Sequence, residues 1–209
     1  MKRGSRLECG LAKRKSADER RRQIAAAAGE LFAERGVQAT TVRDIGDRVG
    51  IRSGSLYHHF KTKNDIVHEL MRSYGADILD RYGEQVQSGG SARGKLERLF
   101  GACVRVNLEY PNETTILIHE LGNLFLQEEF EYIQELLKGV EEIFVQVLVR
   151  GMSAGELRAD LDPSFVYRMM MDVMGAVHRW YDPQVHSEEQ VVKGWLDVFL
   201  SGISVEAQP

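Results

Sequence analysis

The chain has 209 residues, a net charge of −4, two cysteines and 43% hydrophobic residues. This length allows one domain or a small domain joined to a larger one, and the wide separation of Cys9 and Cys103 in unlike contexts argues against a disulfide framework or a zinc site. Because no apolar run reaches the roughly 18 residues of a membrane span and no signal-peptide pattern follows the basic N-terminus, we expect a soluble cytoplasmic protein without a metal or cofactor.

The net charge conceals two oppositely charged parts. Residues 1–63 hold 15 Lys and Arg against 7 Asp and Glu, a net charge of +8, so the remaining residues carry −12. Cationic side chains displace the counterions condensed on DNA phosphates, so the first part can bind nucleic acid. Phosphates would repel the acidic part, which we expect to stand away from a DNA duplex.

The chain begins with a basic segment that lacks apolar periodicity. We expect residues 1–17 to form a flexible arm, which is either a solvated tail or a contact to DNA. A helix is predicted from about Ala17 to Arg35, ended by Gly36. Its apolar stripe consists of Ile24, Ala27, Ala28, Leu31 and Phe32.

A short amphipathic helix is expected next, capped by Thr40 or Thr41. Its apolar residues Val42, Ile45 and Val49 recur at i, i+3 and i+7. The residues between them are mostly charged, so this helix can be buried on one side only.

A glycine turn and a second short helix follow. Gly50 can end the first helix in a left-handed conformation, and Ser53 can cap the second. Leu56 and Phe60 share one face of the second helix at i and i+4, and the polar residues between them project elsewhere. Two such helices around a tight turn indicate a helix-turn-helix, whose second helix enters the major groove of DNA.

The rest of the chain is also predicted to be helical. Thr62 or Asn64 can cap a fourth helix that joins the small domain to the large one. Residues 88–91, Ser-Gly-Gly-Ser, form the clearest loop, and Pro111 ends the helix that follows it. A shorter apolar segment spans residues 116–126.

The C-terminal part contains three further predicted helices. A long helix runs from about Glu128 to Met152, and Asp162 with Pro163 is typical of the start of another. A capping box of Ser187 and Gln190 predicts the last helix. Because no segment alternates with period two, we expect an all-α fold of about nine helices.

Five spaced motifs lie in about the first 70 residues. They are Ala28-x-x-Leu31-Phe32-x-x-x-Gly36, Thr40-Thr41-Val42-x-x-Ile45, Val49-Gly50-Ile51, Ser53-Gly54-x-Leu56-Tyr57-x-His59-Phe60 and Lys63. Together they resemble the DNA-binding domain of the tetracycline-repressor family, TetR/AcrR. Gly46 and Val49 stand where that family often has alanine, a departure that concerns packing detail.

The resemblance implies a homodimeric, ligand-responsive transcriptional regulator that is not an enzyme. Its expected parts are a flexible basic arm at residues 1–17, a helix-turn-helix DNA-binding domain at 18–63 and an effector-binding and dimerisation domain at 64–209. The regulator is expected to act as a repressor that leaves a palindromic operator when an effector binds.

The last two helices carry more apolar residues than one subunit's core obviously needs. We expect a four-helix dimer interface, although packing within the subunit would also explain these residues. They are Met169, Met170, Val173, Met174, Val177, Trp195, Val198, Phe199 and Ile203.

The candidate DNA contacts fall into two groups. Phosphate contacts are expected from Thr41, Arg43, Lys61 and Lys63. Base contacts are expected from Arg52, Ser53, Ser55, Tyr57, His58 and His59. Alternatively, Tyr57 packs against the first helix and His58 is only solvated. Zinc binding by His58 and His59 has little support, because adjacent helical residues diverge by about 100°.

Ligands of this family are expected to bind between the C-terminal helices. Suitable apolar walls, which core packing explains equally well, are Phe100, Cys103, Leu121, Phe125, Phe144, Met171 and Met174. Residues 151–162 and 178–183 resemble the branch of the family that senses fatty-acyl or steroid-derived CoA thioesters. We expect phosphates of such a ligand to meet Arg179, helped by Arg105, Asn107 or His119. Alternatively, Arg179 pairs with an acidic residue at an interface, or the effector is a drug or another lipid.

Two other classes of protein are considered. His119, Glu120 and Cys103 can be imagined as catalytic groups of a small helical enzyme, but no nucleophile elbow, phosphate loop, HExxH or paired-cysteine spacing is present. A DNA-binding architectural protein without an effector is the other class, and it would need no ligand-sized cavity.

Overall fold

The structure, a computed structural model, describes the backbone of residues 4–203 and the side chains of residues 17–203. This part of the chain forms ten α-helices and two short 3-10 helices, with no strand, which confirms the all-α prediction. The bounds are α1 Gly4–Arg35, α2 Val42–Val49, α3 Ser53–Leu56, α4 Lys63–Gln87, α5 Ala92–Glu109, α6 Pro111–Glu120, η1 Leu124–Leu126, η2 Glu128–Phe130, α7 Glu131–Ser153, α8 Pro163–Met174, α9 Val177–Trp180 and α10 Glu188–Ile203. Helices α8 and α9, separated by two residues, correspond to the single eighth helix that we expected.

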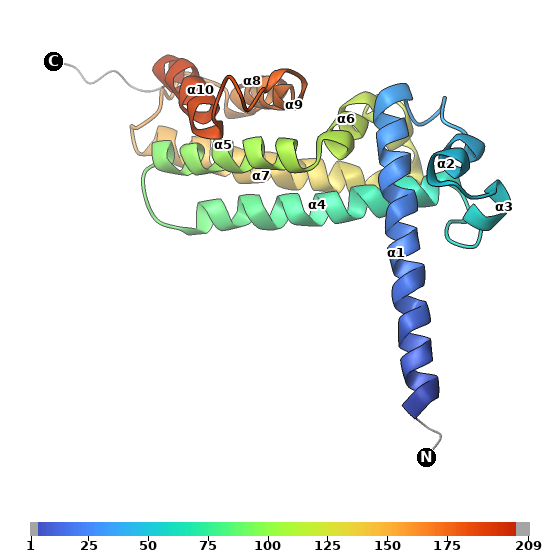
Figure 1. Cartoon of the computed structure of the whole chain (residues 1–209). Helices are drawn as coiled ribbons and strands as arrows, with labels where there is room; N and C mark the ends of the chain where they lie inside the picture. Colours follow the sequence, from blue (N-terminus) through green and yellow to red (C-terminus); the bar gives the residue numbers. More distant parts are fainter. Residues whose placement is uncertain (1–3, 204–209) are drawn as a thin grey trace.

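Helix α1 begins earlier than expected. The predicted start is near Ala17, whereas α1 runs from Gly4. Leu, Arg and Lys occur twice each in residues 4–16 and have high helix propensity, which favours a helical backbone although no apolar stripe is present. Figure 1 shows this end of α1 projecting away from the other helices. The predicted helix start near Ala17 is therefore wrong, whereas a flexible arm at residues 1–17 and its contact with DNA stay predictions. Residues 1–3 and the side chains of residues 4–16 lie outside the described part.

Three predicted helix starts are confirmed by hydrogen bonds. The side chain of Thr62 accepts a bond from the third amide of α4 at 3.0 Å, and Asp162 accepts one from the third amide of α8 at 2.6 Å. The Ser187 amide donates to the Gln190 side chain at 2.8 Å, and the Gln190 amide donates to the Ser187 hydroxyl at 3.2 Å. These side chains satisfy amides that have no partner within the helix, so each fixes a helix boundary.

Helices α4, α5 and α7 lie side by side and form the centre of the C-terminal domain. Helices α8, α9 and α10 lie on one side of them, and α6 connects this domain to α1 (Figure 1). Phe100, Phe144 and Met170 are fully buried between these helices. Burial of each such side chain contributes roughly 1.5–3 kcal/mol.

The DNA-binding helices do not have a separate core. Phe32 of α1 and Phe60 pack in one cluster with Ile116 of α6 and Phe125 of η1. The two domains therefore share buried contacts, so a movement of α6 changes the packing of α1. Among residues 4–203, no helix has the length and hydropathy to cross a membrane.

Candidate DNA-reading segment and effector cavity

Helix α2 and the turn after it have the predicted helix-turn-helix geometry. Thr41 caps α2 in a reciprocal bond with Asp44, and Gly50 ends the helix with a φ of 68°. The amide of Ile51 donates to the carbonyl of Gly46 at 2.9 Å, and a Cβ on Gly46 would lie 2.8 Å from the Ile51 carbonyl oxygen. The close turn therefore explains why glycine stands where the family often has alanine.

The hydroxyl of Thr41 is occupied within this cap. It accepts a bond from the Asp44 amide at 3.1 Å and donates to the Asp44 carboxylate at 2.6 Å. The bonds that the hydroxyl and the backbone amide of Thr41 donate to the Asp44 carboxylate hold the pKa of Asp44 below its usual range. Because the single hydroxyl hydrogen is already donated, the structure does not favour the predicted donation from Thr41 to a phosphate.

Helix α3 is shorter than expected and has a different cap. Its N-cap residue is Arg52, which makes no side-chain cap bond, so the predicted cap by Ser53 is wrong. After Leu56 the chain continues in turns, because the amides of His58 and His59 donate to carbonyls three residues earlier, at 3.3 and 2.9 Å. The segment that reads DNA is thus one helical turn followed by tighter turns.

The predicted base-contacting side chains are mostly exposed on this segment. Leu56 and Phe60 are each 1% exposed and fix the segment to the core, whereas Tyr57 between them is 53% exposed. This exposure leaves the Tyr57 side chain accessible to DNA, and its base contact stays a prediction. The exposed members of the predicted set are Arg52, Ser55, Tyr57 and His58, and the half-buried members are Ser53 and His59.

Arg21 of α1 holds the end of this segment, and sequence reasoning missed it. Its guanidinium donates to the carbonyl of His59, forms two bonds with Glu69 at 3.2 and 2.8 Å, and lies 3.9 Å from the centre of the Phe60 ring. The bond with Glu69 raises the pKa of Arg21. In the sequence, Arg21 is visible only as a basic residue, because its partner Glu69 lies 48 positions away.

Two predicted phosphate contacts lie on the surface, Arg43 in the first turn of α2 and Lys61 after the recognition segment. The Arg43 side chain is 84% exposed, with only a 3.7 Å contact to Asp47 one turn along the helix. Such an exposed pair contributes little, so Arg43 is available to a phosphate.

Lys63, also predicted to contact phosphate, has a different position. Its ammonium donates to the carbonyls of Val37 and Thr40 at 2.5 and 3.0 Å, and more weakly to that of Gln38 at 3.4 Å. Burial lowers the pKa of Lys63, with an opposing effect of nearby Glu120. Three carbonyls match the three ammonium hydrogens, so the structure favours a role in holding the turn after α1 over a phosphate contact.

A mostly apolar cavity of about 380 Å³ lies between α4, α5, α6, α7 and α8. Of the residues that the structure describes, the charged ones lining it are Asp172 and Arg179, which are exposed and mark its rim. This volume is within the range of small-molecule sites. The predicted effector residues that line it are Cys103, Asn107, Leu121, Met171, Met174 and Arg179.

The three predicted phenylalanines belong to the core and do not line this cavity. Phe100 packs against Trp195 and Phe199, with ring centres 6.1 and 6.2 Å apart. Phe125 lies in the cluster shared with the DNA-binding helices. Phe144 packs behind the lining residue Tyr82, with ring centres 5.8 Å apart. Apolar periodicity identified these residues as buried but not which neighbour buries them.

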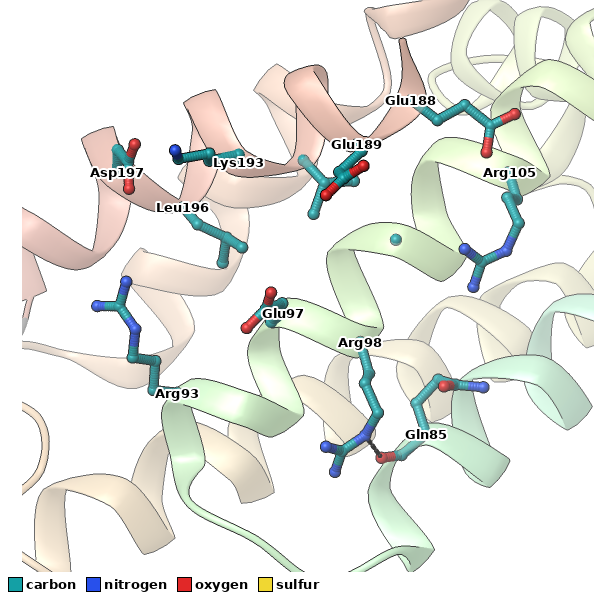
Figure 2. A pocket seen from close by; sticks show the side chains of 12 residues that line it. Gln85, Arg93, Glu97, Arg98, Arg105, Glu188, Glu189, Lys193, Leu196 and Asp197 are labelled. Carbon is teal, nitrogen blue, oxygen red and sulfur yellow. Dashed lines mark hydrogen bonds between the residues drawn. The ribbon is translucent and has the colours of Figure 1, made fainter.

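The predicted helpers Arg105 and His119 are also absent from the cavity wall. His119 is exposed at the end of α6. Arg105 borders a separate cleft of about 650 Å³, formed largely by α5 and α10 (Figure 2). Figure 2 shows acidic and basic side chains alternating there, among them Glu188 beside Arg105. Such mixed charge gives the cleft no preference for an anion.

Sequence reasoning missed three tyrosines in the cavity wall, Tyr74 and Tyr82 of α4 and Tyr167 of α8. Burial raises the pKa of all three hydroxyls and raises the pKa of the Cys103 thiol to about 12. These groups are therefore neutral near pH 7. A thiol with this pKa is a poor nucleophile, which argues against the catalytic alternative for Cys103.

Two helices that line the cavity also hold the turn after α1. The Glu120 carboxylate, 6% exposed at the end of α6, accepts a bond from the amide of Val37 at 3.0 Å. The Val37 carbonyl accepts the bond from Lys63, the first residue of α4. Val37 itself is fully buried. The turn is therefore bonded to α4 on one side and to α6 on the other.

Comparison with known proteins shows the family. A model of the bacterial regulatory proteins of the tetR family matches residues 24–70, and a model of the tetracyclin repressor-like C-terminal domain matches residues 89–203. The chain belongs to the TetR family. It is a ligand-responsive DNA-binding transcriptional regulator and not an enzyme, as predicted, and TetR-family regulators bind operator DNA and small-molecule effectors as dimers.

Relatives of this TetR-family regulator include repressors called KstR2. The HTH-type transcriptional repressor KstR2 of Rhodococcus jostii is 37% identical over 186 residues, covering 88% of this chain and 91% of the relative. A solved structure of KstR2 of Mycobacterium tuberculosis, described as a ketosteroid transcriptional regulator, has a TM-score of 0.83 and 38% identity over 90% of this chain and 96% of its own. The structure of AibR with isovaleryl coenzyme A and operator DNA has a TM-score of 0.75 over 86% of this chain and 97% of its own, and at 19% identity it shares the fold.

Proposed function

We propose that this TetR-family regulator acts in the cytoplasm as a repressor and is released from a palindromic operator by a CoA thioester with an apolar, steroid-derived or fatty-acyl group. The observation that carries the proposal is the cavity of about 380 Å³, which has uncharged walls and Arg179 at its rim. The relationship to KstR2, which is described as a ketosteroid transcriptional regulator, supports the steroid-derived class.

Cavity and rim suit different parts of such a ligand. An apolar acyl group gains free energy by leaving water for the cavity, at roughly 25 cal/mol per Å² of buried surface. The polyanionic part of coenzyme A has no charged partner inside and would stay at the rim. There the guanidinium of Arg179 can bind a phosphate in a bidentate manner, and Asp172 would oppose it.

An acyl-CoA is expected to release the operator at a lower concentration than the matching free acid. A charge-assisted hydrogen bond contributes about 1.5–3 kcal/mol, so Arg179→Met should raise the required concentration of thioester by about tenfold to a hundredfold. A gel-shift titration with both compounds measures this. The control is Arg150→Met, which removes an exposed arginine of α7 that does not line the cavity.

Equal potency of thioester and acid would remove the phosphate-binding role from Arg179. Release by neither compound, together with release by an uncharged drug or another lipid, would favour the drug-sensing or lipid-sensing alternative. A steep fall of operator affinity with salt is expected in every case, because the DNA contacts include phosphates.

Release requires that binding in the cavity changes the DNA-reading segments. In a dimer the two segments enter major grooves about 34–36 Å apart. An effector that favours a different arrangement of α4 and α6 would shift the turn at Val37, which both helices hold. The resulting change in operator affinity is limited by the effector's difference in affinity for the two arrangements.

We propose that the dimer forms through exposed faces of α8 and α10. On α8, Phe165, Met169 and Val173 are 61, 48 and 42% exposed, and on α10 Val198 is 74% exposed. The three side chains of α8 recur every four residues and so share one face of the helix. Burying them together with Val198 in a four-helix interface would remove a large apolar surface from water. Other residues expected at the interface are buried within the subunit, namely Met170, Met174, Val177 and Ile203.

Replacing Val198 by aspartate is expected to give a monomer. A carboxylate at the centre of an apolar interface loses its hydration without a partner. Because one subunit reads only half of the operator, affinity should fall by about a thousandfold, toward non-specific binding. Light scattering and gel shift measure the two effects. The control Val185→Asp changes a residue that is 63% exposed but lies in the loop before α10. A dimeric Val198→Asp variant would show that the interface lies elsewhere.

A further inference from the structure

The wall of the effector cavity contains a pair of hydroxyl groups. The Tyr74 hydroxyl, from α4, lies 3.0 Å from the Thr114 hydroxyl, from α6, and the two residues are 3 and 4% exposed. Both line the cavity. The ring of Tyr110 packs edge-on to that of Tyr74, with centres 5.6 Å apart, which restricts movement of the Tyr74 ring.

The hydrogen bonds of this pair are incomplete. Two hydroxyls carry two hydrogens, and only one of these can lie in the bond between them. Within residues 17–203 neither hydroxyl bonds to another acceptor, in contrast to the neighbouring Thr115, which donates to the Pro111 carbonyl at 2.7 Å. One buried O–H group therefore has no acceptor among the described side chains and backbone, and the cavity is beside it. Leaving such a group unpaired is unfavourable, so a ligand that supplies an acceptor is preferred.

The Tyr74 hydroxyl keeps its hydrogen at physiological pH, because burial raises its pKa. The pair can therefore donate to a neutral oxygen, whereas the surrounding Ile78, Leu117 and Val140 offer only apolar contact. A carbonyl oxygen would complete the hydrogen bonds, and a saturated hydrocarbon would leave them incomplete.

We propose that the Tyr74–Thr114 pair recognises a carbonyl oxygen on the buried part of the effector. The cavity thus selects a keto-substituted ring or chain over its unoxygenated counterpart. This inference rests on the proposed function, since it places the effector in the same cavity. It adds that the two hydroxyls recognise a carbonyl group on the buried end of the effector.

Two probes of matched shape test this selection, 1-decalone and 1-methylenedecalin. They share a fused ring system and differ in one group, C=O against C=CH₂. Wild-type dimer should bind the ketone about tenfold more tightly in calorimetry, the value of one neutral hydrogen bond whose donor is otherwise unpaired. The double variant Tyr74→Phe and Thr114→Val should lose this preference and bind the methylene compound as the wild type does.

Tyr167→Phe is the matched control, because it removes another tyrosine hydroxyl from the same cavity wall and should keep the preference. Unchanged operator binding by each variant shows that it is folded. Equal affinity of the probes for wild type, or the same preference in the double variant, would overturn the inference.

Failure of the proposed function gives a different result. If the ketone binds selectively but saturating ketone leaves the operator complex intact, recognition by the hydroxyl pair stands and the proposed release does not. If neither probe binds the dimer, the cavity is not an effector site, and both proposals fall.

Discussion

The Tyr57→Ala variant is expected to lose specific operator binding while it keeps its fold. Tyr57 is 53% exposed on the segment between two buried anchors, so its removal leaves no cavity in the core. A lost contact to DNA costs about 1–3 kcal/mol, and a dimer loses it twice. Operator affinity should therefore fall by about thirtyfold or more, as measured by gel shift against operator and scrambled DNA.

Two controls separate the possible causes of such a loss. Tyr57→Phe keeps the ring and removes the hydroxyl, so it distinguishes stacking or packing on the sugar-phosphate backbone from a hydrogen bond. Leu126→Ala changes a side chain that is 68% exposed in the C-terminal domain and should bind operator normally. Full retention of operator binding by Tyr57→Ala, with an unchanged melting temperature, would place the DNA contacts elsewhere on the segment.

Features that depend on neighbouring residues were predictable from the sequence. The caps at Thr62, Asp162 and Ser187 each need a partner only three positions away, and all three were confirmed. The left-handed end of α2 at Gly50 is local in the same way. The short α3 was not predicted, because the spacing of Leu56 and Phe60 suits a continued helix, whereas the chain after Leu56 forms tighter turns.

Contacts between distant residues could not be predicted. Lys63 was expected at a phosphate, and its bonds to the turn at Val37 are visible only when α4 is placed beside that turn, 26 positions away. The bond of Glu120 to the same turn spans 83 positions. A charged residue in a sequence shows what it can bind, but the fold decides which partner it meets.

The cavity wall was predicted in part for a similar reason. The predicted wall residues Met171 and Met174 of α8 line the cavity, whereas the predicted wall residues Phe100 and Phe125 fill the core. Hydrophobic spacing identifies a buried face without showing whether that face meets protein or an empty volume. The wall residue Tyr74 was not among the predicted effector residues, although its hydroxyl borders the cavity.

Replacing Glu120 by alanine is expected to uncouple effector binding from operator release. The variant leaves the amide of fully buried Val37 without an acceptor and removes the hydrogen bond between α6 and the turn. An unpaired buried amide costs about 1–3 kcal/mol, which equals the usual size of an allosteric coupling free energy. The link at Glu120 is thus large enough to account for most of the coupling. The variant should still bind operator, while the effector concentration needed for release rises by about tenfold or more.

The coupling is measured as the ratio of effector affinities for the free and the operator-bound dimer. Linkage requires that the effector changes operator affinity by the same factor as the operator changes effector affinity. The factor from gel shift and the factor from calorimetry must therefore agree. Glu120→Gln keeps an acceptor oxygen for Val37 and should retain much of the coupling, and His119→Ala, its exposed neighbour, should retain all of it. An unchanged ratio in Glu120→Ala would assign transmission to α4 and Lys63 alone. The expected result is a lowered ratio in Glu120→Ala. In that variant Lys63 still donates to the Val37 carbonyl, so a lowered ratio would mean that α4 and α6 must move together to shift the turn.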